Sequence, residues 1–515
     1  MKHVARSTLI IAVFFGLEKI LGFFRQILIA RTFQLSPELD AFNAANNIPD
    51  LLFALISGGA LAMAFIPVLT DYREEKGKSE TWNLFSQITN LVFLVTAGLS
   101  ILVAVAAGPL VSWGVGIAPG FNPEMQGLVT VLMRWNLIAT LLFSLGGLAI
   151  AGLQSHQHFL VPALAPSLYD VGAMIGILIF APSEPYTIGP ITLPALGLGI
   201  YGLVYGVILG SALFLLIQVP TLVHYKFRWT PRVNLNHPGV RRVIQLMLPR
   251  VFTVFFIQLV FITQDNLASR LATGSVTALV YGWLFMQVPE SLIGTSLGTA
   301  LLPTLSEQIS RGETEKFHRT LGKTIRVILS LTVPAAVILA VNIGPLLSVL
   351  SFDAAGQELV LWTVRAYLVG LIGHSLLEVA ARTFYAQKDA RTPLITAGLT
   401  FGLFLILGAF LAPRLGAPGI GLANSLAFSA EAGLLFGLYY RKLPRIPRLG
   451  NTLLRVGAGT GLALTLSLLA QRWIDPAQAV GLRGIISSGL IMTAAAGIVL
   501  PWILPEVRTL LQLER

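Results

Sequence analysis

The stretch FGLEKILGFFRQILIARTFQLSPELDAFNAANNIPDLLFALISGGALAMAFIPVLTDY, residues 15–72, decides the fold class of this chain. It holds two long apolar segments joined by a short polar turn, and about 20 apolar residues are enough for a helix to cross a bilayer. The first segment nevertheless contains Glu18, Lys19 and Arg25. Charged side chains inside a membrane span are rare and usually face a cavity or a charged partner. We therefore expect two membrane helices, with a functional site on the first.

Apolar segments of this kind recur along all 515 residues, of which 55% are hydrophobic and only 11% charged. A soluble chain carries about 25% charged residues. The composition therefore predicts an all-α polytopic membrane protein with about 14 transmembrane helices. The predicted spans are 7–33, 41–69, 85–112, 127–153, 160–181, 197–223, 245–271, 274–302, 323–350, 358–386, 393–412, 417–440, 450–471 and 482–503.

The N-terminus combines basic residues with an apolar run, as a secretory signal peptide does. The apolar run continues towards Phe33 without a small-residue cleavage pattern, so we expect a retained first helix.

The connections between spans alternate in charge. Basic residues gather in one set, for example in 73–78 and 226–242, whereas 114–127 and 352–357 contain no Lys or Arg. Cytoplasmic loops of membrane proteins carry the excess of Lys and Arg. The net charge of +11 is therefore explained without a nucleic-acid partner, and both termini are predicted to be cytoplasmic.

An internal repeat is visible in the sequence. PDLLFALISGGALAMAFIPVLTDYREEKG, from Pro49, resembles PESLIGTSLGTALLPTLSEQISRGE, from Pro289. Such repeats are typical of transporters whose two halves move against each other. The repeat predicts two six-helix lobes, residues 1–223 and 245–440, joined by a basic cytoplasmic linker at 224–244. Residues 441–515 then supply two additional helices and a tail.

Several segments in the same order resemble one known family. They are ILGFFRQILIARTF (20–33), LDAFNAANNIPDLL (39–52), ALAMAFIPVL (60–69), IAPGF (117–121), VPALAPSLYD (161–170), LASRLATGSV (267–276), LGTALLPTLS (297–306) and FYAQKDARTP (384–393). The chain is similar here to the MurJ (MviN) family of lipid II flippases, within the MATE-like (MOP) exporter superfamily.

This resemblance implies a flippase of the bacterial cytoplasmic (inner) membrane. It would carry lipid II, an undecaprenyl-diphosphate-linked disaccharide-pentapeptide, from the inner to the outer leaflet by alternating access, as a monomer surrounded by membrane lipid. A coupling ion, Na⁺ or H⁺, is compatible with it, and no other cofactor or metal is expected. Two alternatives stay open: a flippase for another polyprenyl-diphosphate-linked glycan, and a MATE-like exporter of small molecules.

The resemblance also implies which cations bind the substrate. The family's first helix usually carries two arginines, and here Lys19 and Arg25 stand at those places. We expect both to contact the substrate. Arg31, near the outer end of the same helix, is a further candidate. Arg250, in the seventh span, is not part of the usual family pattern; it either replaces a missing cavity cation or lies at the cytoplasmic interface. The family often has an Arg in its second helix and an Asp-Arg pair with a nearby Glu in its eighth. These charges are absent here, where the corresponding places hold Phe53, Ala54, Trp283, Leu284 and Gln287.

Three acidic residues are candidates for a gate or for ion coupling. Glu18 lies seven residues before Arg25, on nearly the same helix face, and is a possible partner for it. Asp40 stands near the start of the second span, either as a helix cap or as part of a gate. Asp265 lies in the seventh span, where a carboxylate is a suitable ligand for a hard cation.

Two further patterns have open interpretations. His374, Glu378 and Arg382 recur every four residues and indicate either a proton relay or, as we favour, a self-neutralising structural network. Gly58 and Gly59, with Gly294 and Gly298 as their counterparts in the repeat, indicate either helix bending or close packing.

Enzyme activity is not expected. The chain has no cysteine, contains no P-loop, GxSxG or HExxH pattern, and shows no cluster of acids suited to Mg²⁺.

Overall fold

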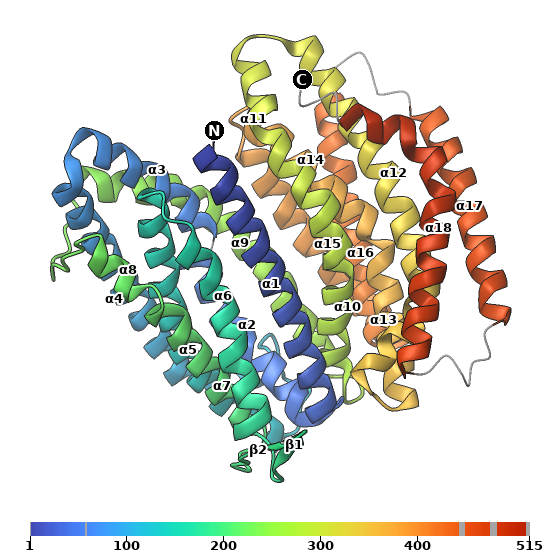
Figure 1. Ribbon diagram of the computed structural model, residues 1–515, viewed down its shortest axis with the longest axis horizontal. Coiled ribbons are helices and arrows are strands. Elements are labelled where there is room, and N and C mark those ends of the chain that lie inside the picture. Colours follow the sequence, from blue (N-terminus) through green and yellow to red (C-terminus); the bar gives the residue numbers. More distant parts are fainter. Residues whose placement is uncertain (1, 57–58, 442–448, 474–480, 511–515) are drawn as a thin grey trace. The chain divides into compact units, whose positions relative to one another are not determined.

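The structure of the chain is a computed structural model that describes residues 2–56, 59–441, 449–473 and 481–510. The described residues are almost entirely helical (Figure 1). They form two compact units, Met1–Arg270 and Leu271–Arg515. Each unit is described below by itself.

The first unit contains nine α-helices, one π-helical turn and one β-hairpin in its described part. These are α1 (Lys2–Phe33), α2 (Pro37–Ile56), α3 (Gly59–Glu75), α4 (Gly77–Ser112), α5 (Pro123–Ser155), α6 (Leu160–Ile175), η1 (Gly176–Phe180), β1 (Tyr186–Ile188), β2 (Ile191–Leu193), α7 (Ile200–Leu216), α8 (Val219–His224) and α9 (Pro238–Ala268). The strands β1 and β2 are antiparallel.

The second unit is helical throughout its described part. Its elements are α10 (Ser275–Glu290), the π-helical turn η2 (Ser291–Thr295), α11 (Ser296–Ser310), α12 (Thr314–Leu347), the 3₁₀ turn η3 (Ser348–Leu350), α13 (Ala354–Val369), α14 (Leu371–Ala386), α15 (Arg391–Leu415), α16 (Ala417–Tyr440), α17 (Gly450–Trp473) and α18 (Gly481–Leu510).

The predicted all-helical fold with many membrane-spanning helices is confirmed. Among the described residues, twelve helical segments are long and apolar enough to cross a membrane, and they coincide with the twelve spans predicted from 85–112 onward. The two remaining predicted spans, 7–33 and 41–69, correspond to α1 and to α2 with α3. The two halves of the sequence repeat fall on α2 with α3 and on α10, η2 and α11.

The start of α2 differs from one expectation for Asp40. The hydroxyl of Ser36 accepts a hydrogen bond from the backbone N–H of Leu39 at 3.2 Å, so Ser36 caps the helix. Asp40 lies inside the first turn, where it is almost fully buried. A serine with its hydroxyl on the N–H three residues later is the usual N-cap geometry.

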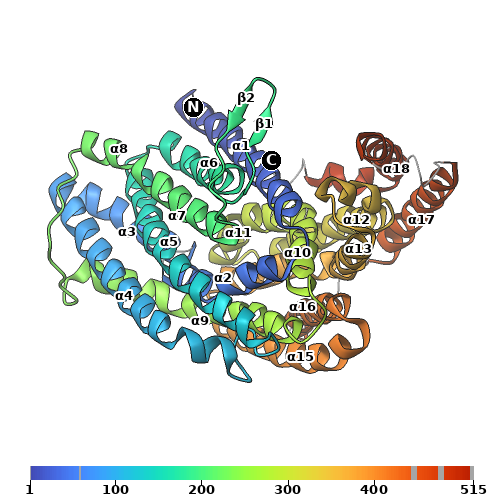
Figure 2. The same ribbon diagram turned by 90° about the horizontal axis from the view of Figure 1, so that it is seen from below.

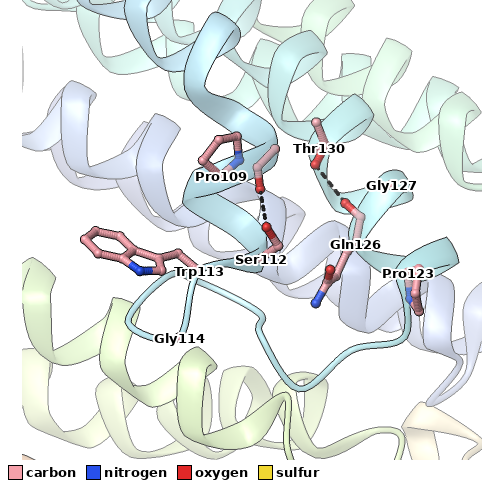
Figure 3. A pocket seen from close by; sticks show the side chains of 9 residues that line it. Pro109, Ser112, Trp113, Gly114, Pro123, Gln126, Gly127 and Thr130 are labelled. Carbon is pink, nitrogen blue, oxygen red and sulfur yellow. Dashed lines mark hydrogen bonds between the residues drawn. The ribbon is translucent and has the colours of Figure 1, made fainter.

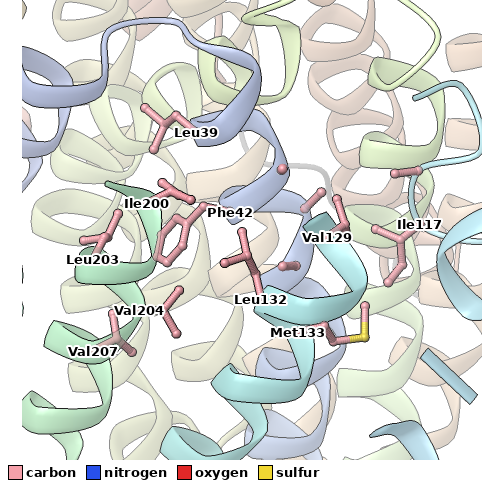
Figure 4. Close-up of a cluster of buried hydrophobic side chains, with 14 of the residues drawn as sticks. Leu39, Phe42, Ile117, Val129, Leu132, Met133, Ile200, Leu203, Val204 and Val207 are labelled. Atoms are coloured by element: carbon pink, nitrogen blue, oxygen red, sulfur yellow. The ribbon is translucent and has the colours of Figure 1, made fainter. Parts of the chain in front are cut away.

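The core of the first unit lies where α2, α5 and α7 meet (Figure 4). Its buried side chains include Leu39, Phe42, Ile117, Val129, Leu132, Met133, Ile200, Leu203, Val204 and Val207.

Beside this core, α6, its continuation η1 and α7 approach each other through glycine. A Cβ added to Gly206 would lie 2.6 Å from the Cα atom of Gly176. Glycine at such positions lets two membrane helices come into backbone contact.

The last turns of α9 pack on the loop between α4 and α5. The side-chain amide of Asn266 donates to the carbonyl oxygens of Gly114 (3.1 Å) and Gly116 (2.6 Å). The backbone N–H of Gly120 donates to the hydroxyl of Ser269 at 3.1 Å. These contacts place α9 in the first compact unit, so the units divide after Arg270, whereas the predicted lobes are divided by the linker at 224–244.

Candidate functional site

Arg25 and Asp170 form a buried ion pair between α1 and α6. Nη1 of Arg25 lies 3.3 Å from a carboxylate oxygen of Asp170, and the two side chains are 18% and 3% exposed. The guanidinium carbon also lies 4.8 Å from the centre of the Tyr169 ring. A carboxylate and an aromatic face both favour a cation that has left water. The predicted membrane arginine is therefore held in place by two neighbouring residues of α6.

Other charges surround this pair. Gly22, one turn before Arg25, faces the same carboxylate, because a Cβ there would lie 3.8 Å from an Asp170 oxygen. The electrostatic neighbours of Tyr169 are Arg25, Asp170 and also Asp50, which stands on α2. Nε of Arg25 has no hydrogen-bond partner within the described residues. The guanidinium thus has one buried N–H without an acceptor among the described residues.

The partner predicted for Arg25 is not its ion-pair partner. Glu18 pairs instead with the adjacent Lys19, at 3.2 Å between Nζ and a carboxylate oxygen. The Lys19 side chain is 61% exposed, so this pair is a weak contact at a surface. Both residues line a cavity of about 280 Å³ with Gln154, Phe159, Pro162, Ala163 and Pro166.

The two other substrate-binding candidates lie apart from this ion pair along the chain. Arg31 is exposed in the last turn of α1. Arg250 belongs to α9, but its side chain lies outside the described part of the structure.

A second polar cluster surrounds the buried end of α9. The side-chain amide of Asn47 donates to the carboxylate of Asp265, and both Asp265 and the nearby Asp40 are less than 5% exposed. Asn136 of α5 donates to the side-chain oxygen of Asn46 at 2.8 Å. The two gate or coupling candidates Asp40 and Asp265 are thus brought together, with amides of α2 beside them.

The IAPGF segment packs against the end of α9, beyond Asp265. A Cβ on Gly120 would collide with the backbone of Ser269 and Arg270, so only glycine fits beside the end of α9. A neighbouring open cavity of about 860 Å³ lies between the end of α4 and the start of α5 (Figure 3). Its lining residues are Gly108, Pro109, Ser112, Trp113, Gly114, Pro123, Gln126, Gly127 and Thr130.

The second unit has its own partly buried charges. Arg382 of α14 pairs with Glu378, its neighbour one turn earlier, and donates to the hydroxyl of Thr299 at 3.3 Å. Glu290, at the end of α10, accepts from Thr295 at 3.2 Å and has Glu378 and Arg382 as electrostatic neighbours. The guanidinium of Arg382 therefore interacts with two carboxylates, those of Glu378 and Glu290.

The predicted His374–Glu378–Arg382 column forms only in part. The imidazole Nε2 of His374 lies 3.0 Å from the side-chain oxygen of Asn424, and its ring stacks on Phe428 with 4.5 Å between centroids. His374 thus interacts with α16, while Glu378 and Arg382 interact with α10, η2 and α11.

The glycines of the second repeat pack closely against α14. A Cβ on Gly294 would lie 2.7 Å from the Cα atom of Ser375, and a Cβ on Gly298 would lie 2.8 Å from Nη1 of Arg382. These contacts fit the packing interpretation of both residues. Gly58 is outside the described residues, and the surroundings of Gly59 are not described either.

Two partners of the candidate site residues escaped prediction from sequence. Asp170 is recognisable as a charge in an apolar span, but its pairing with Arg25 joins residues 145 positions apart. Asn47 carries no charge and lies in a helix with several other polar residues, among them Asn43 and Asn46, so its partner could not be read from the sequence. Within the described residues, no three His, Cys, Asp or Glu side chains converge as metal ligands.

Comparison with known proteins identifies the family. The family model described as "Lipid II flippase MurJ" matches residues 29–480. The lipid II flippase MurJ of Burkholderia cenocepacia is 32% identical over 448 residues, covering 84% of this chain and 83% of the relative. The probable lipid II flippase MurJ of Vibrio cholerae is 25% identical over 508 residues, or 95% and 94% of the two chains.

Solved structures agree on the fold. A lipid II flippase MurJ in an inward closed conformation superposes with a TM-score of 0.76 at 22% identity, covering 96% of this chain and all of the other. An inward-facing multidrug-resistance MATE transporter of the MOP superfamily gives 0.66 at 14% identity, covering 83% and 93%. The family model and the relatives confirm the resemblance read from the sequence motifs, and the chain belongs to the family of the lipid II flippase MurJ.

Proposed function

We propose that this chain is a flippase that moves lipid II from the inner to the outer leaflet of the bacterial cytoplasmic membrane, with both termini in the cytoplasm. Family membership supports the cargo. The observation in this chain that carries the proposal is Arg25, a cation buried in a membrane helix with one N–H left for an acceptor. A guanidinium binds phosphate oxygens strongly where water is excluded.

In the proposed mechanism, Arg25 binds the diphosphate, and Asp170 stabilises the charged guanidinium before the diphosphate binds. With no substrate present, the carboxylate offsets the cost of a buried cation. When the diphosphate arrives, it takes over part of that role, while the polyprenyl tail stays in lipid. Lys19, exposed six residues before Arg25, is suited to attract the anionic headgroup before it reaches Arg25.

Closure around the headgroup and opening to the other side would complete one cycle of alternating access. An inside-negative membrane potential helps an anion to move outward, by about 2.3 kcal/mol for each charge and 100 mV. The buried carboxylates Asp40 and Asp265 are our candidates for a gate or for coupling to Na⁺ or H⁺. We propose that a single chain performs the cycle without chemical catalysis.

The test is complementation of a bacterial strain depleted of its own lipid II flippase. Wild-type chain should restore growth and wall synthesis, and Arg25→Ala should fail at equal abundance in the membrane. If the wild-type chain is abundant in the membrane but does not restore wall synthesis, lipid II is not its cargo.

A second candidate cargo is another polyprenyl-diphosphate-linked glycan. One observation favours it: the second and eighth spans hold Phe53, Ala54 and Gln287 where the family often has charges. Such a cargo keeps the diphosphate for Arg25 but needs fewer cations for a headgroup without peptide carboxylates. Transport of a diphosphate-linked glycan by a chain that does not complement lipid II flipping would support it.

A further inference from the structure

The connection between α8 and α9 is fastened along one face of α4. In both views it passes around the outer side of α4 at the left edge of the first unit (Figures 1 and 2). We call residues 225–233 the linker strap. Trp82, Ser86 and Asn90 hold it, and residues spaced by four share one face of a helix. The polar side chains on this face form hydrogen bonds with the strap and therefore do not face the bilayer.

The hydrogen bonds to the strap form a continuous series. They run from Trp82 Nε1 to the Tyr225 carbonyl (3.1 Å), from Ser86 Oγ to the Arg228 carbonyl (3.4 Å), from the Thr230 N–H to Ser86 Oγ (3.3 Å), from Asn90 Nδ2 to the carbonyls of Thr230 (2.7 Å) and Arg232 (3.0 Å), and from Trp229 Nε1 to Asn90 Oδ1 (2.7 Å). These hydrogen bonds therefore fix the strap along α4.

Side chains alternate along the first part of the strap. The rings of Tyr225 and Phe227 turn inward, and Phe227 packs against Trp82 and Phe85 with centroids 5.3 and 5.2 Å apart. Lys226 and Arg228 are exposed on the opposite side. The inward rings anchor the strap and leave its basic side chains facing outward.

The length and composition of α4 indicate that the strap lies at the depth of the lipid headgroups. The 36 residues of α4 span about 54 Å at about 1.5 Å per residue, much more than the ~30 Å of a hydrocarbon core. The continuous apolar part of α4 begins at Leu91, where exposed side chains such as Leu94 and Val95 provide a lipid-facing surface. Trp229, bonded to Asn90 and 61% exposed, stands at that boundary, where tryptophan is favoured.

The charge of this region has one sign. Residues 219–250 contain six Lys or Arg and no Asp or Glu. One of the six, Arg242, pairs with Asp71 at 3.1 Å. Lys226, Arg228 and Arg232 are exposed on the strap itself. A basic, tryptophan-bearing surface at the edge of the hydrocarbon is complementary to anionic headgroups.

We infer that the linker strap is a binding surface for anionic phospholipid headgroups, with Lys226, Arg228 and Arg232 contacting phosphates and Trp229 lying among the glycerol esters. The inference is independent of the cargo that the chain transports. It predicts that the first unit retains anionic lipid at this edge.

The test measures binding of phosphatidylglycerol and phosphatidylcholine to delipidated full-length protein by native mass spectrometry in detergent. Wild type should prefer phosphatidylglycerol. Because each basic residue near an anionic surface contributes on the order of fivefold in affinity, the variant K226Q/R228Q/R232Q should lose at least about tenfold for phosphatidylglycerol and little for phosphatidylcholine. Added salt should weaken only the binding of the anionic lipid.

The matched control is R311Q/K316Q/R319Q, which removes the same charge from exposed positions at the end of α11 and the start of α12 in the second unit. There, Arg311 and Lys316 already pair with glutamates. It should bind phosphatidylglycerol nearly as wild type does. Asn90→Leu keeps every cation but removes the hydrogen bonds that hold Trp229, Thr230 and Arg232, and should also weaken binding. Equal losses in the two triple variants, or unchanged binding in Asn90→Leu, would overturn the inference. Thermal melting checks that each variant is folded.

Discussion

Removing the charge of Asp170 should destabilise the first unit more than removing both charges of its ion pair with Arg25. Asp170→Asn leaves a guanidinium that is only 18% exposed, with the Tyr169 side chain beside it and the Glu18 carboxylate near it but not in ion-pair contact. Breaking a buried pair from one side costs about 3–5 kcal/mol, and the partial exposure of Arg25 places the expected loss at the lower end. Adding Arg25→Gln removes the isolated cation and should recover about 1–3 kcal/mol, as coupled neighbours do.

The assay is equilibrium unfolding in detergent of wild type, both single variants and the double variant. The Glu18–Lys19 pair is the control, because Lys19 is 61% exposed and Glu18→Gln should change stability by less than about 1 kcal/mol. Transport gives an independent readout. If Arg25 binds the diphosphate, the double variant regains stability without regaining transport. Wild-type stability in Asp170→Asn would refute the buried-pair argument, and normal transport by the double variant would refute the binding role.

Three further predictions concern other parts of the first unit and its surroundings. Asp265→Leu leaves the amide of Asn47 without its acceptor and should lower the free energy of unfolding by about 1–3 kcal/mol. Asp265→Asn keeps an acceptor and should leave that free energy nearly unchanged. An Asp265→Asn variant that is stable but cannot transport would separate a coupling role from a structural one. Gly206→Val forces α6 and α7 apart and should lower the free energy of unfolding by about 1–3 kcal/mol or more. Gly433→Val places its side chain in open space and should leave the melting temperature nearly unchanged. Similar losses of stability in both variants would contradict the packing account. Burial lowers the pKa of the His156 imidazole, so His156 binds a proton more readily in the unfolded chain than in the folded one. The stability should therefore fall as the pH drops through about 6.5. This fall should be smaller in His156→Phe, and identical pH profiles of the two proteins would exclude His156 as its source.

The membrane spans could be predicted from the sequence because each span is encoded by neighbouring residues. A span is recognised from about 20 neighbouring residues, and every predicted span from 85–112 onward has a helix at the same place. Arg25 stands out for the same reason, since a charge inside such a segment is visible without any other part of the chain.

The partners of these charges were not predictable in the same way. Glu18 shares a helix face with Arg25 by sequence spacing, yet the arginine turns to Asp170 on α6, because an ion pair forms where helices pack and not where charges are near in sequence. His374 was likewise expected beside Glu378, but it bonds to Asn424 on α16.

The position of α9 has a similar explanation. Sequence repetition groups the seventh span with the second half of the chain. Packing groups it with the first, because Asn266 and Ser269 bond to the loop that contains Gly120. The fit of that glycine against a helix end depends on distances between backbones that a single sequence does not contain.

The proposal that the chain moves lipid II is tested most directly in reconstituted vesicles. Purified chain would be incorporated into vesicles whose lipid II carries a headgroup fluorophore, and a membrane-impermeant quencher would be added outside. The account predicts that the inner-leaflet fraction becomes accessible to the quencher with wild type and stays protected with Arg25→Ala incorporated at equal density. Inner-leaflet lipid II that stays protected with well-folded wild-type chain, or becomes accessible equally fast with both proteins, would contradict it.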